Sequence, residues 1–165
     1  MLAVSNTSPL SNLAWIGRLD LLWHQLPDLR IPTAVAREIE DHPDASAREM
    51  IQSAILESRI VVCEPHDTRL RGILRQQLHG GEADAIALAA DLKADLILID
   101  ELEGRTVAGQ AGLAVSGTLG ILLRAKRTGE LTSIAPEIAA LRQRARFFLS
   151  PALEKQVLIA AGEER

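Results

Sequence analysis

Cysteine and aromatic residues are scarce in this chain of 165 residues. It contains one cysteine, two tryptophans, two phenylalanines and no tyrosine. The lone Cys63 excludes an intramolecular disulfide and is typical of proteins from a reducing compartment. The hydrophobic core must therefore be built from leucine, isoleucine, valine and alanine, and a hydrophobic content of 47% is enough for one.

Long apolar runs are absent as well. No uninterrupted stretch approaches the roughly 18 residues of a membrane helix, and the apolar start at 2–4 is too short for a signal peptide. We therefore expect a soluble, cytoplasmic protein without a membrane partner. The length favours a single domain over 1–165, because domains typically contain about 100–150 residues.

Several motifs of well-understood chemistry are missing. No G-x-G-x-x-G follows the first apolar segment, and no G-x-x-x-x-G-K-S/T occurs anywhere. Gly80-Gly81 alone is too weak a signal for a phosphate cradle. Cys63 lies in a β-branched run and is expected to be buried rather than nucleophilic. The four histidines show no ligand spacing and are expected at the surface: His24, His42, His66 and His79.

Positive charge is not in excess, because the formal net charge is −4. A protein that binds nucleic acid through its phosphates is usually basic overall or on one face. Such a role would need a local basic patch in this chain.

Short apolar strands alternate with helical patterns along the chain. Strands are expected at 3–4, 29–31, 60–63, 96–99 and 113–115. Thr7 or Ser8 is expected to cap the first helix, and 68–78 is a helix or a loop. Further helices are expected at 19–22, 34–38, 45–57, 82–90, 102–110, 117–126, 136–146 and 151–161. Strands that are apolar throughout and alternate with helices predict an α/β fold, with a parallel sheet covered on both faces.

Polar groups gather where this fold would place a ligand. In open parallel sheets, ligands bind outside the carboxyl ends of the strands. Asn6 follows the first expected strand, and Asp100-Glu101 follows the fourth. Glu82 and Asp84 begin the helix before that fourth strand, and Glu38 ends a helix after the second.

Ordinary structural roles explain each of these residues singly. Acidic residues in a first helical turn complement the helix dipole, which accounts for Glu82 and Asp84. Glu38 lies in a charged run and fits a solvated helix end. Polar residues after strands are common in loops.

Convergence of the same residues would indicate a metal site. Several carboxylates at one sheet edge repel each other, so a cluster of them needs a cation. Oxygen ligands of this kind select Mg²⁺ or Mn²⁺. Such a metal supports phosphodiester hydrolysis, because it polarises a phosphoryl oxygen and lowers the pKa of an attacking water.

Five motifs in order give the chain a family resemblance. They are VSNTSPLSNLA, IPTAVAREI, GGEADAIALA, LILIDELEGR and VSGTLGILLRAK, followed by a C-terminal helix that ends near AGE. With these motifs the chain resembles the PIN-domain superfamily, and more closely a bacterial PIN-like nuclease group of toxin-like, VapC-type relatives. The resemblance covers essentially the whole chain.

The resemblance implies a three-layer α/β/α sandwich with a central parallel sheet. It also implies a ribonuclease that depends on Mg²⁺ or Mn²⁺. Many such proteins are toxins of toxin–antitoxin pairs, so the implied partners are an RNA substrate, a small antitoxin protein and a second copy in a homodimer.

The resemblance also carries over a set of site residues. Asn6 stands where the family's first aspartate follows the first strand, and Glu38 matches the glutamate of a Val-x-x-Glu segment. Asp84 matches the aspartate of the helix before the fourth strand, with Glu82 as an additional acid. The last acid is Asp100 or Glu101. The implied catalytic residues are Glu38, Asp84 and Asp100, and the implied metal ligands are Asn6, Glu38, Glu82, Asp84, Asp100 and Glu101.

Two threonines and two groups of arginines complete the candidates. Thr7 and Thr118 would contact substrate or support the ligands, although Thr118 also fits a helix cap. Arginines at 69, 71 and 75 and at 142, 144 and 146 fit a solvated helix face, with substrate contact as the alternative. Because aromatic residues are few, contacts to the nucleic acid backbone are expected to dominate over base stacking.

Asn6 departs from the family pattern. An amide oxygen can ligate a hard cation, but it carries no charge and cannot act as a base. The chain is therefore either an active nuclease or a catalytically impaired PIN-like domain that acts as a binding or regulatory module.

Overall fold

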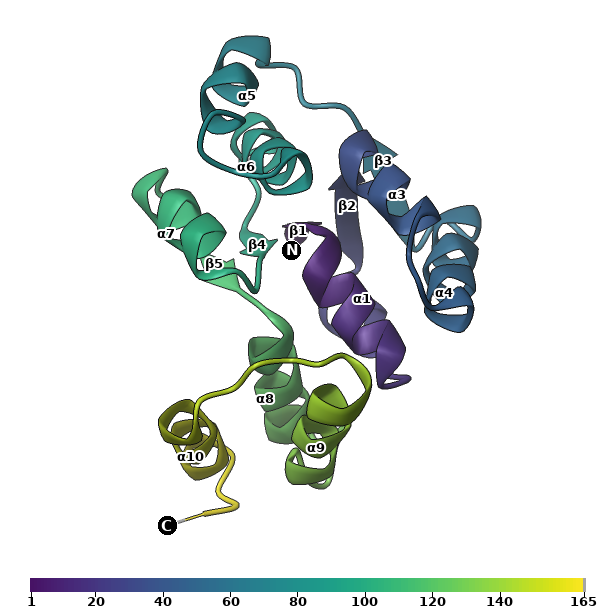
Figure 1. Ribbon diagram of the computed structural model, residues 1–165, viewed down its shortest axis with the longest axis vertical. Coiled ribbons are helices and arrows are strands. Elements are labelled where there is room, and N and C mark those ends of the chain that lie inside the picture. Colours follow the sequence, from purple (N-terminus) through teal and green to yellow (C-terminus); the bar gives the residue numbers. More distant parts are fainter. Residues whose placement is uncertain (165) are drawn as a thin grey trace.

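The computed structural model describes residues 1–164 and contains a five-stranded sheet (Figure 1). The strands follow the order β3-β2-β1-β4-β5, and every pairing is parallel. They are β1 (Leu2–Ser5), β2 (Asp28–Pro32), β3 (Ile60–Cys63), β4 (Leu96–Leu98) and β5 (Val115–Ser116). The parallel sheet confirms the predicted α/β class.

Helices connect the strands and cover both faces of the sheet. They are α1 (Thr7–Trp15), α2 (Leu21–Gln25), α3 (Thr33–Glu40), α4 (Ala45–Leu56), α5 (Thr68–Leu74), α6 (Gly80–Leu92), α7 (Leu102–Gln110), α8 (Thr118–Thr128), α9 (Ala135–Arg144) and α10 (Pro151–Ala160). Among the described residues, no helix is long and apolar enough to cross a membrane.

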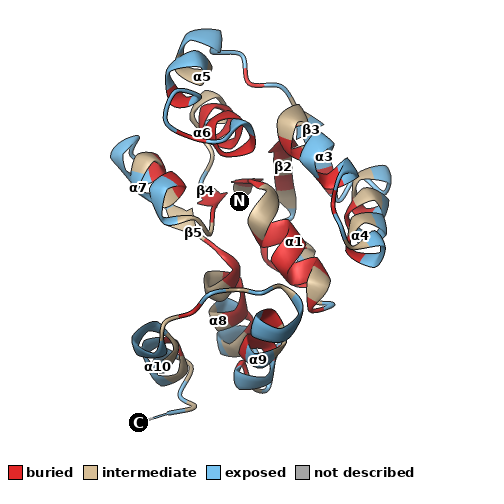
Figure 2. Cartoon of the chain, viewed as in Figure 1, coloured by how far each residue is buried: buried red, intermediate tan, exposed pale blue. Residues whose placement is uncertain are grey.

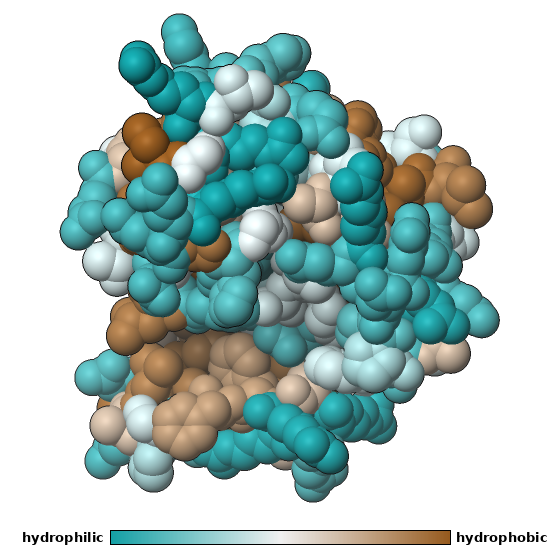
Figure 3. Space-filling view, turned by 45° about the horizontal axis from the view of Figure 1, so that its top comes forward, coloured by the Kyte–Doolittle hydropathy of each residue, from teal (hydrophilic) through white to brown (hydrophobic). Residues whose placement is uncertain are grey.

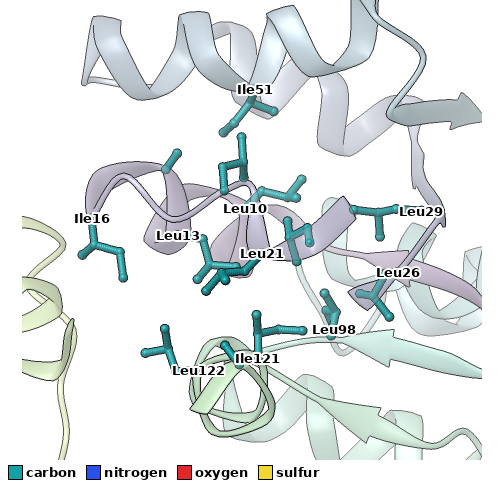
Figure 4. Packing of buried hydrophobic residues seen from close by; sticks show 14 of the residues in the cluster. Leu10, Leu13, Ile16, Leu21, Leu26, Leu29, Ile51, Leu98, Ile121 and Leu122 are labelled. Carbon is teal, nitrogen blue, oxygen red and sulfur yellow. The ribbon is translucent and has the colours of Figure 1, made fainter. Parts of the chain in front are cut away.

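Successive strand residues point to opposite faces of the sheet and enter two separate cores. Ala3 and Leu98 belong to a core with residues of α1–α4 and α8–α10, and Figure 4 shows Leu10, Leu29, Ile51, Leu98 and Ile121 packing within it. Val4 and Ile97 belong to a second core with residues of α5–α7. Two cores on one sheet make the three-layer α/β/α sandwich, and the buried residues lie along the inner faces of its elements (Figure 2).

The boundaries differ from the sequence expectation in three places that matter for the site. Helix α6 begins at Gly80, which places Glu82 inside its first turn. Helix α9 ends at Arg144 and not at Arg146, because Arg146 adopts the left-handed backbone conformation with φ 51°. The residue that precedes α1 and occupies its N-cap position is Asn6 and not Thr7 or Ser8.

Candidate functional site

The crevice between β1 and β4 is the point where the strand order changes direction. From β1 the chain moves to β2 and β3 on one side, whereas β4 and β5 lie on the other. Ligands of open α/β sheets bind at such a switch point. A pocket of about 370 Å³ opens here, lined by Asn6, Thr7, Ser8, Glu38, His79, Glu82 and Glu101. We call it the acidic pocket.

Asn6 is fixed at the bottom of this crevice and is only 3% exposed. Its backbone N–H donates to the Leu98 carbonyl of β4 at 3.1 Å. Its Nδ2 donates to Glu101 Oε2 at 2.9 Å, and since a carboxylate only accepts, this contact also fixes which side of the amide is the oxygen. That oxygen, Oδ1, is buried and has no hydrogen-bond partner within residues 1–164.

Glu38 reaches the pocket from α3 and is held at both oxygens. Thr7 Oγ1 donates to Oε2, and the Gly81 N–H donates to Oε1 at 3.1 Å. A Cβ on Gly81 would lie 2.5 Å from Oε1, so only glycine allows this approach. Gly81 therefore makes room for the Glu38 carboxylate and donates a hydrogen bond to it. The sequence did not indicate this role for the Gly80-Gly81 pair.

Glu82 projects into the pocket from the first turn of α6 and is 8% exposed. Its Oε2 accepts from the His79 N–H at 3.3 Å. Burial raises the pKa of Glu82, and the negative charge of Glu101 raises it further. The pocket thus opposes ionisation of Glu82.

Glu101 and Asp100 follow β4 and turn to different partners. Glu101 accepts from Ser8 Oγ and from Asn6 Nδ2. Asp100 accepts from Thr118 through the backbone N–H at 2.7 Å and Oγ1 at 2.6 Å, and from Asn12 Nδ2 at 2.8 Å. Burial raises the pKa of Asp100 although these hydrogen bonds lower it. Thr118 and Asn12 therefore both orient the Asp100 carboxylate. No motif in the sequence indicated this role for Asn12.

Asp84 lies outside the acidic pocket, two residues beyond Glu82. It is fully buried, and two arginines of the α5 region donate hydrogen bonds to both of its oxygens. Arg71 donates at 2.9 and 2.7 Å, and Arg75 donates at 2.9 and 2.8 Å. Successive helical residues are about 100° apart, so positions 82 and 84 point to different sides of α6.

The carboxylates converge only in part. Among residues 1–164, no three histidine, cysteine, aspartate or glutamate side chains lie close enough together to form a metal-binding group. Asn6, Glu38, Glu82 and Glu101 share one pocket, Asp100 stands beside it, and Asp84 does not line it. The metal and catalytic roles of all six residues stay predictions at this point.

A parallel sheet in this order, with carboxylates at its switch point, defines an α/β protein with a candidate ligand site between β1 and β4. The model of the family DUF3368, described as a PIN domain, matches residues 2–163. The chain therefore belongs to the PIN-domain superfamily. No curated protein matches it. PIN domains are typically nucleases that act on nucleic acid and generally use divalent metals, so membership supports a nuclease-type function.

Proposed function

We propose that this protein is a ribonuclease that hydrolyses phosphodiester bonds with Mg²⁺ or Mn²⁺ in the acidic pocket. The observation that carries the proposal is the buried Oδ1 of Asn6, which has no partner among residues 1–164 and lies in one pocket with three carboxylates. An unpaired buried acceptor is destabilising, and so is a cluster of like charges. A hard cation would relieve both.

The residues present suit such a cation in their chemistry. Asn6, Glu38, Glu82 and Glu101 offer oxygen atoms only, as Mg²⁺ and Mn²⁺ prefer. Burial and, after it, the negative charge of Glu101 raise the pKa of Glu82, and a bound cation would favour its ionised form. When bound, the metal would polarise a phosphoryl oxygen and lower the pKa of a water.

The other residues hold these acids in place. Thr7 and Gly81 orient Glu38, and Ser8 orients Glu101. Thr118 and Asn12 orient Asp100. We assign Asp100 the role of the general base that accepts a proton from the attacking water. Burial raises the pKa of Asp100, which makes it a stronger base than a solvated aspartate.

We leave Asp84 out of the metal set. Both of its oxygens accept two charge-assisted bonds, and ligation would require Arg71 and Arg75 to leave. Asp84 instead anchors the α5 region to α6, and Glu82 supplies the acid from this helix.

We also propose two protein partners, a second copy of the chain and an antitoxin. The resemblance to toxin-like PIN proteins supports a homodimer that is silenced by a small antitoxin protein. Light scattering tests the dimer, since it should give about twice the chain mass of 17.9 kDa. Co-purification with the product of the neighbouring gene tests the antitoxin.

A second candidate function is a binding or regulatory module without cleavage. Asn6 favours this second function, because its Nδ2 donates a hydrogen bond to Glu101 and its side chain adds no charge to the pocket. The two functions differ in whether RNA is cut.

Cleavage of single-stranded and structured RNAs, with Mn²⁺ or with EDTA, tests the proposal. We expect metal-dependent cleavage that Glu82→Gln and Asp100→Asn reduce at least a hundredfold. Glu49→Gln, at an exposed acid of α4, is the matched control and should cleave normally. Absence of metal-dependent cleavage in both the native protein and Asn6→Asp would favour the binding module.

A further inference from the structure

A larger cleft of about 510 Å³ adjoins the acidic pocket and has a different lining. The two share Thr7, Ser8, Glu38 and Glu101, so they are continuous. Asp100 also lines the cleft. Its far wall comes from 145–148, between α9 and α10. The volume is in the usual range of small-ligand sites, about 300–1,000 Å³.

Aromatic residues concentrate in this cleft. The whole chain has four of them, and three line it: Trp15, Phe147 and Phe148. The Phe148 side chain is 89% exposed, although burying a phenylalanine is normally favourable. Figure 3 shows hydrophobic side chains gathered around a hollow in the lower left part of the molecule.

Trp15 and His42 form a fixed aromatic pair in the lining. Their ring centroids are 4.7 Å apart, with an interplanar angle of 60°. His42 Nδ1 lies 3.1 Å from the backbone nitrogen of Asp44 and 3.2 Å from its carbonyl oxygen, so Asp44 holds this side of the ring in either tautomer. The other ring nitrogen is Nε2. This Nε2 is buried and has no partner within residues 1–164. The pair thus contributes aromatic surface to the lining of the cleft.

Arg146 adds positive charge to the same wall. It is exposed, and among the described residues it forms no ion pair and no side-chain hydrogen bond. Its left-handed φ of 51° is uncommon for a residue other than glycine, and it turns the chain after α9. A free guanidinium is well suited to an anionic oxygen such as that of a phosphate.

We propose that this cleft binds an unpaired nucleobase of the RNA strand, next to the phosphate held at the acidic pocket. Phe148 stacks on the base, the Trp15–His42 pair forms the opposite part of the subsite, and Arg146 pairs with the neighbouring phosphate. The inference rests on the proposed nuclease function for its choice of RNA. Exposed aromatic rings beside a cation are the usual platform for single-stranded nucleic acid.

The base must be unpaired, because stacking on a side chain requires it to leave the duplex. The protein therefore selects single-stranded regions. This changes the sequence expectation that backbone contacts dominate, since the few aromatics of the chain are concentrated at one place.

Binding in EDTA tests the inference without requiring cleavage. The probe is a fluorescein-labelled single-stranded oligoribonucleotide of mixed sequence, measured by anisotropy. We expect Phe148→Ala to weaken binding roughly 10- to 100-fold, the loss typical of one base stack, and Phe148→Trp to preserve it. Leu56→Ala is the matched control, because Leu56 is 86% exposed and does not line the cleft.

Tryptophan fluorescence gives a second measurement at the cleft itself. The Trp23→Phe variant keeps Trp15 as its single tryptophan, and Trp23 lies elsewhere, beneath Arg59. We expect the oligoribonucleotide to quench Trp15 emission in this variant, and a duplex of the same sequence to leave it unchanged.

The outcomes separate this inference from the proposed function. Equal affinity of Phe148→Ala and the native protein would overturn the inference, even if RNA is cleaved. Weakened binding of Phe148→Ala supports it, even if no RNA is cleaved. A change of oligomeric mass in Phe148→Ala with unchanged RNA affinity would mean that the exposed ring serves a protein contact, and would also overturn it.

Discussion

Asn6 combines two properties that a single residue rarely has. Its Nδ2 offsets part of the repulsion between the acids by donating to Glu101, while its Oδ1 is buried and has no partner in the described part of the chain. Without a metal, the amide therefore stabilises the pocket through its hydrogen bond to Glu101, which an ionised aspartate could not donate. As a metal ligand, the same amide would be weaker than an aspartate, because it brings no charge.

Replacing Asn6 by aspartate should reverse this balance. In Asn6→Asp a carboxylate would face Glu101 Oε2 in place of a donor now 2.9 Å away. We expect the metal-free variant to lose about 1–3 kcal/mol of unfolding free energy, the usual result of losing a buried bond. Mn²⁺ should raise its melting temperature more than that of the native protein. Thermal unfolding with EDTA and with Mn²⁺ measures both, and an unchanged response to Mn²⁺ would contradict the metal site.

Glu82 should make the metal-free protein sensitive to pH. Its pKa is raised in the folded state by burial and by Glu101, so its stabilising effect is present below the unfolded pKa and is lost as pH rises through the folded pKa. We expect Glu82→Gln in EDTA to melt at a higher temperature than the native protein near pH 7, and the difference to vanish near pH 4. A variant that melts lower at pH 7 would show that the ionised carboxylate is stabilising. Glu49→Gln controls for loss of charge alone.

At the scale of elements, α6 carries two acids with opposite tasks. Glu82 faces the switch point, and Asp84 faces the arginines of the α5 region. The sequence predicted this helix and both acids, but it did not separate their directions. Two residues advance about 200° around a helix, and that rotation would have placed only one of them at the sheet edge.

Loss of the Asp84 contacts should destabilise the fold and leave the metal site intact. Asp84→Ala removes the carboxylate that joins α6 to both arginines, although Arg71 keeps Glu64 at 3.4 Å and both guanidinium groups are partly exposed. We expect it to cost about 1.5–3 kcal/mol of unfolding free energy, the usual loss for hydrogen bonds to a charged group. Urea unfolding measures this loss. The melting-temperature rise caused by Mn²⁺ should persist in Asp84→Ala and disappear in Glu82→Gln. The opposite pattern would return Asp84 to the metal set.

Gly81 gives the sharpest test of how α6 meets α3. Alanine normally stabilises a helix interior by roughly 0.5–1 kcal/mol relative to glycine. Gly109→Ala, in α7 with open space around the position, should show this gain. Gly81→Ala should instead lose stability and RNA cleavage, because its Cβ would lie 2.5 Å from Glu38 Oε1. Equal gains in both variants by thermal unfolding would show that Glu38 moves away freely.

Across the whole molecule, the strands and helices could be predicted from the sequence, but the contacts made by the connecting segments could not. Apolar strands and helical periodicity indicated the parallel sheet and its two covered faces, because these patterns depend on local sequence. The Phe147-Phe148 wall lies in a connection between helices, and its place beside Asp100 depends on packing of distant segments. The hydroxyls of Thr7 and Ser8 likewise found partners that are far away in the sequence.

The overall acidity should keep RNA binding weakly dependent on salt. With a net charge of −4 and Arg146 as the single arginine among the described residues of the cleft, few counterions are released. We expect log affinity against log salt to fall with a slope of about −0.7 for one phosphate contact on a single strand. Arg146→Gln should flatten the slope, and Arg144→Gln, outside the cleft, should not. A steep slope in the native protein would point to a broader basic surface.

The two walls of the cleft come from distant parts of the chain. The acids follow β1 and β4 and lie in α3 and α6, whereas the aromatic wall is a connection close to the last helix. In the proposed function, the residues for cleavage and those for base binding therefore lie in separate segments of the chain. Exchanging 145–150 between relatives would change which RNA is held while leaving every acid untouched, which makes this connection a natural place for substrate preference to diverge.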